Sequence, residues 1–328
     1  MTKKIFPFAT GNSPFNSFKL VLISEGYLAS ESSKFASDCQ EFTFRLVQTS
    51  PFNMSRSNAR WLSIYTIFTA SNNSGPSIDA PAGTGRTAFE SSVNTHLGTL
   101  TVNIVKFKAF VNVERLSVKG EAIPLSEFCA EGIPTYGNTG TLIVLLLPSG
   151  SSGTLGGELE YNPGLNDYHF VATSCDGEWQ QVIFRGIAKC LGLGDEFELP
   201  GNDFLEPPLA ARKYVPFFNL EYFSVPPITN DASIKWRSLL GATQRKAQPI
   251  VHAKTSNIAT PDNTYNSFPM TPERIEYWEG GGGFRTHIYR TAKDCLMRRR
   301  IGDQNLPVRS QHVAFCIACR KFLEGIIS

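Results

Sequence analysis

Residues 179–191 have the clearest helical periodicity in the chain. Apolar residues recur there at spacings of three and four, which places them along one side of a helix, and polar residues fall on the other side. The apolar side consists of Trp179, Val182, Ile183, Ile187, Cys190 and Leu191, and the polar side of Gln181, Arg185 and Lys189. We predict a helix with one face in the core, preceded by Asp176 as N-cap and ended by Gly192 and Gly194.

Apolar runs elsewhere predict strands. The runs at 18–23 and 141–147 are apolar at nearly every position and predict buried strands, the second of them central in its sheet. Residues 61–70 alternate well enough for a further strand, and residues 168–172 suit an edge strand. A helix is predicted over about 30–48. Its apolar positions are Phe35, Cys39, Phe42, Phe44 and Leu46.

Three other segments have simpler patterns. Residues 101–107 are interpreted as a short strand and residues 108–117 as a connecting helix, and residues 311–327 are helical in pattern. The stretch 83–87 contains two glycines but lacks the lysine and the spacing of a phosphate-binding loop. We interpret it as a plain loop.

Composition indicates an ordinary globular protein. The chain has 328 residues, of which 41% are hydrophobic and 18% charged, and a net charge of +2. That charge gives no overall basic surface of the kind that binds nucleic acid, and the cluster 298–300 is interpreted as solvated surface. The apolar run 142–147 is far too short for a membrane span, which takes roughly 20 residues. We expect neither a nucleic-acid partner nor a membrane span.

The N-terminal residues contain lysines but no long apolar region, so we expect no secretory signal. The expected location is therefore the cytoplasm, or the outside of the cell through a route that needs no such signal.

The seven cysteines are an odd number, which argues against a dense disulfide framework and predicts at least one free thiol. Cys316 and Cys319 have the Cys-x-x-Cys spacing of metal-binding and redox-active cysteines. With Cys295 and His312 they form a candidate structural zinc site. Buried thiols or one disulfide are the alternatives.

The predicted helix and the residues after it resemble the zinc helix of the IgA-peptidase-type metallopeptidases, a metzincin-like family. Members read His-Glu-x-x-His-x-x-Gly-x-x-Asp-Glu-Tyr at this place, where two histidines and the aspartate bind zinc and the glutamate is the base. In this chain Gly192 and Asp195 match that pattern. Arg185 and Lys189 stand in place of the histidines, and Gly186 in place of the base.

Other parts of the chain carry the same resemblance, which covers roughly residues 17–325. The turn after the first strand resembles the family's Gly-Asp-Gly-Tyr, with Glu25 in place of the aspartate. Gly156 and Gly157 lie where members have a glycine-rich loop at the cleft rim. Met297 lies in a Cys-x-Met-Arg string like the family's Met-turn, the methionine under the metal site.

The resemblance implies an α/β (α+β) metzincin-like fold. Its sheet is expected to be mixed but mostly parallel, with an edge strand over a cleft and with helices packed on the sheet. After an N-terminal arm at 1–17, residues 18–328 are expected to form one metallopeptidase-like domain. Its upper subdomain, about 18–194, and its lower subdomain, about 195–328, would flank the cleft.

The same resemblance implies that zinc and catalysis are lost. Arginine has no acceptor lone pair, and lysine ligates only when it is deprotonated, so Asp195 is the one matched ligand. We therefore expect a pseudoenzyme without a cofactor at this helix, acting as a structural module or binding a protein, peptide or glycan in its cleft. Further cleft candidates are Gly156, Gly157, His169, Glu196, Glu279 and Met297.

A hydrolase or peptidase with relocated chemistry is the alternative. Asp195, Glu196 or Glu279 would then serve as acid or base. The five histidines include no pair at the helical spacing of a metal site, so no substitute zinc helix is expected. Ser151 and Ser152 lie in a glycine-serine loop without the turn that exposes a nucleophilic serine.

Overall fold

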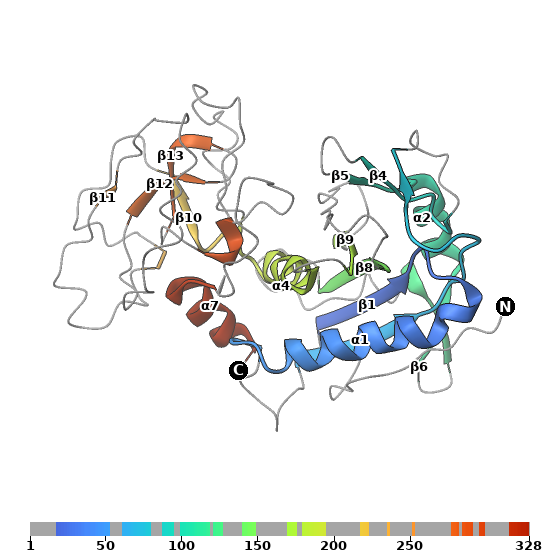
Figure 1. Cartoon of the computed structure of the whole chain (residues 1–328). Helices are drawn as coiled ribbons and strands as arrows, with labels where there is room; N and C mark the ends of the chain where they lie inside the picture. Colours follow the sequence, from blue (N-terminus) through green and yellow to red (C-terminus); the bar gives the residue numbers. More distant parts are fainter. Residues whose placement is uncertain are drawn as a thin grey trace. The chain divides into compact units, whose positions relative to one another are not determined.

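The chain forms two compact units, each described here by itself (Figure 1). Described residues up to Leu191 belong to the first unit, and described residues from Gly192 onward belong to the second. The structure, a computed structural model, describes residues 18–52, 61–79, 87–94, 99–118, 121–126, 140–148, 169–175, 179–194, 217–222, 235–236, 251–252, 277–281, 284–290, 295–298 and 315–327.

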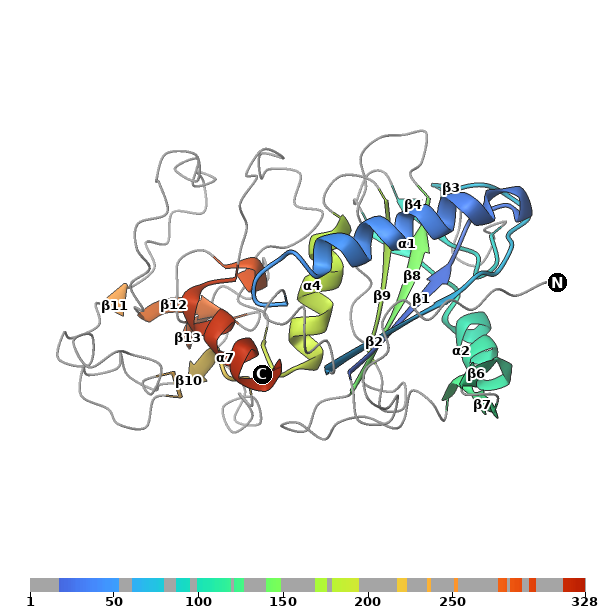
Figure 2. The same ribbon diagram turned by 90° about the horizontal axis from the view of Figure 1, so that it is seen from below.

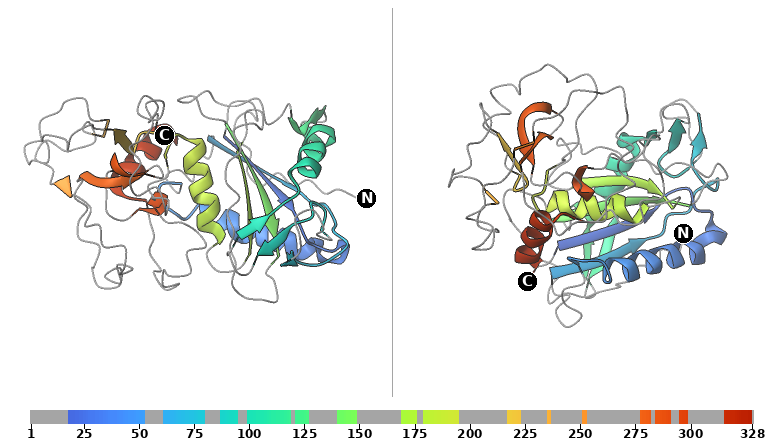
Figure 3. Two further views of the ribbon diagram at one scale, coloured as in Figure 1. Left: turned by 90° about the horizontal axis from the view of Figure 1, so that it is seen from above. Right: turned by 60° about the vertical axis from the view of Figure 1, so that its left-hand side comes forward.

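A four-stranded parallel sheet forms the centre of the first unit (Figure 3). β1 (Phe18–Ser24) lies between β2 (Leu62–Ile67) and β8 (Thr141–Leu147), and β9 (His169–Ser174) pairs with the other side of β8. All residues of β1, β2 and β8 are buried, which explains why most of them are apolar. The predicted strands are confirmed, with 141–147 inside the sheet and β9 at the edge of its described part.

α1 (Ser32–Leu46) and α4 (Trp179–Cys190) pack together, and α4 contacts the sheet (Figure 2). The ring of Phe42 in α1 lies 5.8 Å from that of Trp179 and 5.9 Å from that of Phe184. Both predicted helices are confirmed. Phe44, expected among the apolar positions of α1, is instead 61% exposed, because it follows Phe42 by two residues and so points away from the buried side.

α2 (Ile104–Val113) packs on the opposite face of the sheet. Its Phe107 and Val111, one helical turn apart, join a buried cluster with alternate residues of β1 and β8, including Val21 and Ile143. Neighbouring residues of a strand point to opposite faces, so the sheet is covered on both sides. The predicted α/β class with a mostly parallel sheet is thereby confirmed.

The prediction of a strand at 101–107 is wrong. The side chain of Asn103 accepts a hydrogen bond from the backbone N–H of Lys106 at 3.1 Å, which caps the N-terminus of α2. The helix therefore begins four residues before the predicted 108–117 and ends at Val113.

The first unit also contains two short sheets. One consists of β3 (Ser77–Ile78), β4 (Ser92–Asn94) and β5 (Thr99–Thr101), and the other of β6 (Arg115–Val118) and β7 (Glu121–Pro124).

The second unit contains a small mixed sheet in the order β10, β13, β12, β11. These strands are β10 (Leu220–Tyr222), β11 (Val251–His252), β12 (Tyr277–Gly281) and β13 (Phe284–Arg290). The 3-10 turn η5 (Leu296–Arg298) and the helix α7 (Ile317–Ile327) complete it, and α7 confirms the helical pattern of the C-terminal residues. Among the described residues, no helix is both long and apolar enough to span a membrane.

Candidate functional site

α4 is buried on nearly every side. All its residues except Gln181 and Lys189 are buried, and Arg185 is only 1% exposed. Arg185 lies on the polar side of the helical pattern, and the structure buries that position. A buried guanidinium needs polar partners, and both Arg185 and Lys189 have interactions within the protein. Arg185 is thus a cation of the interior.

Gly186 faces the sheet. A Cβ atom built at this glycine would lie 3.0 Å from Cδ2 of Leu142 in β8 and 3.5 Å from Cγ1 of Val171 in β9. The Cβ atom of any side chain at this position would therefore contact aliphatic side chains. The nearest neighbours of Gly186 are therefore those of a packing position, which does not favour a carboxylate base.

The turn after α4 depends on two glycines, as predicted. Gly192 has a φ of +108°, a conformation that residues with a Cβ rarely adopt. The backbone N–H of Gly194 donates to Oδ1 of Asn219 at 2.7 Å, and Nδ2 of Asn219 donates to the carbonyl of Gly194 at 2.9 Å. The buried Asn219 thus fixes the backbone directly before Asp195, which itself lies outside the described residues.

Gly194→Ala is expected to lower the free energy of unfolding by about 1–3 kcal/mol. The added Cβ would lie 2.6 Å from the ring of Phe217, and that ring has to move. Gly325→Ala is the matched control, because a Cβ at this exposed position of α7 has no neighbour within 4 Å, and alanine there should add about 0.5–1 kcal/mol of stability. Urea unfolding of both variants measures the difference. Equal stability of the two would show that Gly194 is not tightly packed.

Glu25 is a fully buried carboxylate at the end of β1. It accepts hydrogen bonds from the backbone N–H of Phe89 at 3.0 Å, from the backbone N–H of Ser91 at 3.2 Å and from the hydroxyl of Thr87. Burial raises the pKa of Glu25 above its ordinary value, although these hydrogen bonds oppose the rise. The carboxylate therefore holds the segment 87–91 against the end of β1.

Tyr27, Asp38 and Cys175 form a second polar group in the first unit. The Tyr27 hydroxyl donates to Oδ2 of Asp38 at 2.7 Å and lies 3.4 Å from Sγ of Cys175. Burial raises the pKa of the Cys175 thiol, and burial also raises the pKa of Cys39 nearby on α1. Neutral thiols are poor nucleophiles, so this group favours a structural role.

Glu221 and Lys235 form a partly buried pair in the second unit, with 3.7 Å between Oε2 and Nζ. Burial raises the pKa of Glu221 and lowers the pKa of Lys235, while each partner opposes the shift of the other. Nζ of Lys235 also donates to the carbonyls of Phe217 at 3.3 Å and Leu220 at 2.9 Å. The Lys235 side chain therefore binds the backbone carbonyls of Phe217 and Leu220 at the same time.

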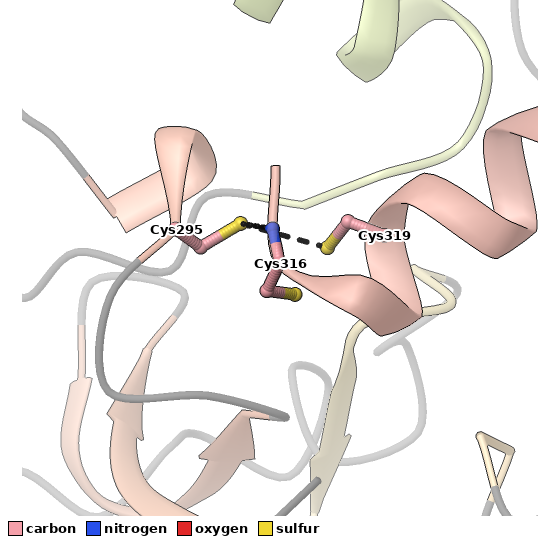
Figure 4. Close-up of side chains that lie close together, drawn as sticks. All are labelled: Cys295, Cys316 and Cys319. Carbon is pink, nitrogen blue, oxygen red and sulfur yellow. Dashed lines mark hydrogen bonds between the residues drawn. The ribbon is translucent and has the colours of Figure 1, made fainter. Parts of the chain in front are cut away.

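Three buried cysteines meet in the second unit (Figure 4). Cys295 directly precedes η5, Cys316 directly precedes α7, and Cys319 lies in the first turn of α7. Sγ of Cys295 is 3.7 Å from Sγ of Cys319, and the backbone N–H of Cys316 donates to Sγ of Cys295 at 3.4 Å. We call these three residues the cysteine triad.

The cysteine triad has the geometry of a metal site. Its three sulfur atoms all lie within 4.8 Å of one another. On a tetrahedral zinc ion with Zn–S bonds of about 2.3 Å, sulfur ligands lie about 3.8 Å apart, which is close to the Cys295–Cys319 distance. Burial raises the pKa of Cys319 well above its usual value. None of the three cysteines is paired in a disulfide, and the spacing of their sulfur atoms suits a bound metal ion.

The remaining predicted residues are only partly described. His169 lies at the start of β9, opposite Leu142, and Glu279 lies on β12, opposite Tyr289. Met297 is completely buried in η5, two residues after Cys295. Outside the described residues are Gly156, Gly157, Asp176, Asp195, Glu196 and His312.

Two features were missed by the sequence interpretation. The network around Glu25 joins residues more than sixty positions apart and has no local pattern, apart from a charged residue directly after an apolar strand. The pair of hydrogen bonds between Asn219 and Gly194 also joins residues that are distant in the sequence. The sequence did indicate an unusual backbone conformation nearby, because Gly192 follows the end of the helix by two residues.

Comparison of the chain with models of protein families found no match, and comparison with curated protein sequences found none either.

Proposed function

We propose that this protein is a catalytically degenerate metallopeptidase-like protein, similar to the IgA-peptidase-type family, that acts as a binding or structural module. The observation that carries the proposal is the burial of Arg185 in α4, at the place where the motif requires a zinc-binding histidine. Gly186, at the place of the base, supports it because it packs on Leu142 and Val171.

The chemistry of these positions does not suit a zinc hydrolase. Metal-assisted hydrolysis needs a bound water with its pKa lowered toward about 7 and a base that takes its proton. Arg185 offers no lone pair, and Gly186 has no side chain to accept a proton. The residues present therefore do not fit a catalytic zinc at α4.

A protein, peptide or glycan is the proposed partner, bound in the cleft that the resemblance implies. Support for an extended peptide comes from β9, which lies at the edge of the described sheet and pairs on one side with β8. Such an edge offers backbone hydrogen bonds to an added strand. This is a binding mode that needs neither zinc nor a base.

Protease assays test this proposal against the alternative, a hydrolase with relocated residues such as Asp195, Glu196 or Glu279. The purified chain, with and without added zinc, is expected to leave casein and immunoglobulin intact. Cleavage that is lost on Glu279→Gln would favour the alternative, whereas cleavage that a chelator abolishes would contradict the proposal altogether.

We further propose that the cysteine triad binds one structural zinc ion, with His312 as the fourth ligand. The distances between the three sulfur atoms support zinc binding by the triad. A structural zinc contributes about 10–16 kcal/mol of binding free energy near neutral pH, as much as the whole stability of an ordinary domain. Chelation should therefore lower the stability of the second unit.

Cobalt substitution tests the zinc centre directly. The wild-type chain should take up one ion, with the sulfur-to-cobalt absorption of a thiolate site, and Cys319→Ser should lose it. Cys175→Ser is the matched control, because Cys175 lies in the first unit beside Tyr27. His312→Ala should weaken binding; unchanged affinity in this variant would remove His312 from the site but leave the triad.

A further inference from the structure

α7 is fixed at two places within the second unit. Its N-terminal end carries Cys316 and Cys319, whose sulfurs face Cys295 before η5 (Figure 4). Near its middle, the ring of Phe322 stacks on the ring of Phe218, with centroids 4.4 Å apart and an interplanar angle of 11°. The helix therefore connects the cysteine triad to the segment 217–222.

The segment 217–222 in turn holds the turn that follows α4. The backbone N–H of Phe218 donates to the carbonyl of Gly192 at 3.2 Å. The next residue, Asn219, is completely buried and makes both hydrogen bonds to Gly194. A continuous series of contacts thus runs from the cysteine triad through Phe322 and Phe218 to residues 192–194.

We infer that the cysteine triad binds a divalent thiophilic cation, zinc being the expected one, and that this cation orders α7. Through the stack of Phe322 on Phe218, the ordered helix fixes the backbone at 192–194, at the degenerate zinc motif. This inference rests on the proposed zinc centre.

The metal is the element that makes this connection rigid. Without it, the cysteines of the triad are joined by hydrogen bonds to sulfur, such as those of Cys295 with Cys319 and with the Cys316 N–H, which are weak interactions. A metal replaces them with three bonds that join Cys295 to both ends of the Cys-x-x-Cys turn. Sulfur donors select zinc and similar soft ions over magnesium and calcium, which prefer oxygen.

Hydrogen exchange of the full chain, followed by mass spectrometry with and without zinc, tests the inference. Zinc should slow exchange at least about tenfold in three segments, 315–327, 217–222 and 192–194, and leave β1 and β8 nearly unchanged. Magnesium should have no effect. Phe322→Ala should keep one bound zinc but lose the protection of 217–222 and 192–194, and Cys175→Ser should behave as the wild type.

Each outcome has a separate meaning. One bound zinc with protection confined to 295–298 and 315–319 would overturn the inferred connection while leaving the zinc centre intact. Absence of zinc binding to the wild-type chain would overturn the zinc centre and the connection together. Retained protection at 192–194 in Phe322→Ala would show that the aromatic stack does not transmit the effect.

Discussion

Glu25→Ala is expected to lower the free energy of unfolding by about 3 kcal/mol or more, because a buried donor left without an acceptor costs about 1–3 kcal/mol. The change removes the acceptor of the buried Phe89 N–H. It also removes one partner each from the Ser91 N–H and the Thr87 hydroxyl, which keep their hydrogen bonds to each other's residue. It also leaves a cavity at the end of β1. Urea unfolding at neutral pH, with circular dichroism as the signal, measures this loss.

Glu25→Gln is the control for charge. Its amide oxygen can take the place of Oε1, which receives hydrogen bonds from Thr87, Phe89 and Ser91, whereas its NH₂ group replaces the acceptor Oε2 beside the Phe89 N–H. We therefore expect glutamine to be less destabilising than alanine. Equal losses in both variants would show that the hydrogen bonds are not what stabilises the segment 87–91.

The raised pKa of Glu25 also predicts a pH dependence. The folded-state pKa lies above the ordinary value of 4.5, because burial disfavours the charged form. The folded chain therefore holds its proton more tightly, and the contribution of this group to stability is largest below pH 4.5 and is lost as the pH rises through the raised value. The stability of the wild type relative to Glu25→Gln should fall over that range.

Gly186→Glu is expected to lower the free energy of unfolding by about 2–5 kcal/mol, because it places a carboxylate in an apolar environment. The Cβ atom of the new side chain would lie 3.0 Å from Leu142 and 3.5 Å from Val171, both of them aliphatic side chains. Gly186→Ala is the control. Its methyl group requires only a small shift of the flexible end of Leu142 and gains helix propensity, so its effect should stay within about 1 kcal/mol.

The comparison of these two variants decides how α4 is oriented. In a working zinc peptidase the base opens on the cleft, so a glutamate there would be tolerated. If Gly186→Glu is as stable as Gly186→Ala, the position faces solvent or a polar cleft and the packing described for α4 is wrong. The same result would favour the motif-rebuilding variant Arg185→His, Gly186→Glu, Lys189→His as a zinc binder.

Much of the fold could be predicted because strong apolar runs have few alternatives. β1 and β8 are buried on both faces, so their sequences are apolar at nearly every position. α4 ends where Gly192 adopts a positive φ, and glycine is the residue that allows this conformation. Local sequence therefore determined these elements and their ends.

Other features depend on distant residues and were predicted less well. The polar side of α4 suggested an open face, but Arg185 is buried because tertiary structure also covers that side. Residues 101–107 contain a strand-like run, and the cap at Asn103 favoured a helix instead. The cysteine triad brings together residues 21 and 24 positions apart, so sequence spacing identified candidate ligands and the fold brought their sulfurs together.

Zinc-edge anomalous diffraction from crystals of the zinc-loaded protein most directly tests the proposal that α4 is a degenerate zinc helix. We predict one strong peak within about 2.3 Å of the sulfur atoms of Cys295, Cys316 and Cys319, the usual Zn–S distance. No peak is predicted within bonding distance of Asp195 or of any side chain of α4. A zinc peak at Asp195 or on α4 would contradict the proposal that this helix has lost its catalytic metal.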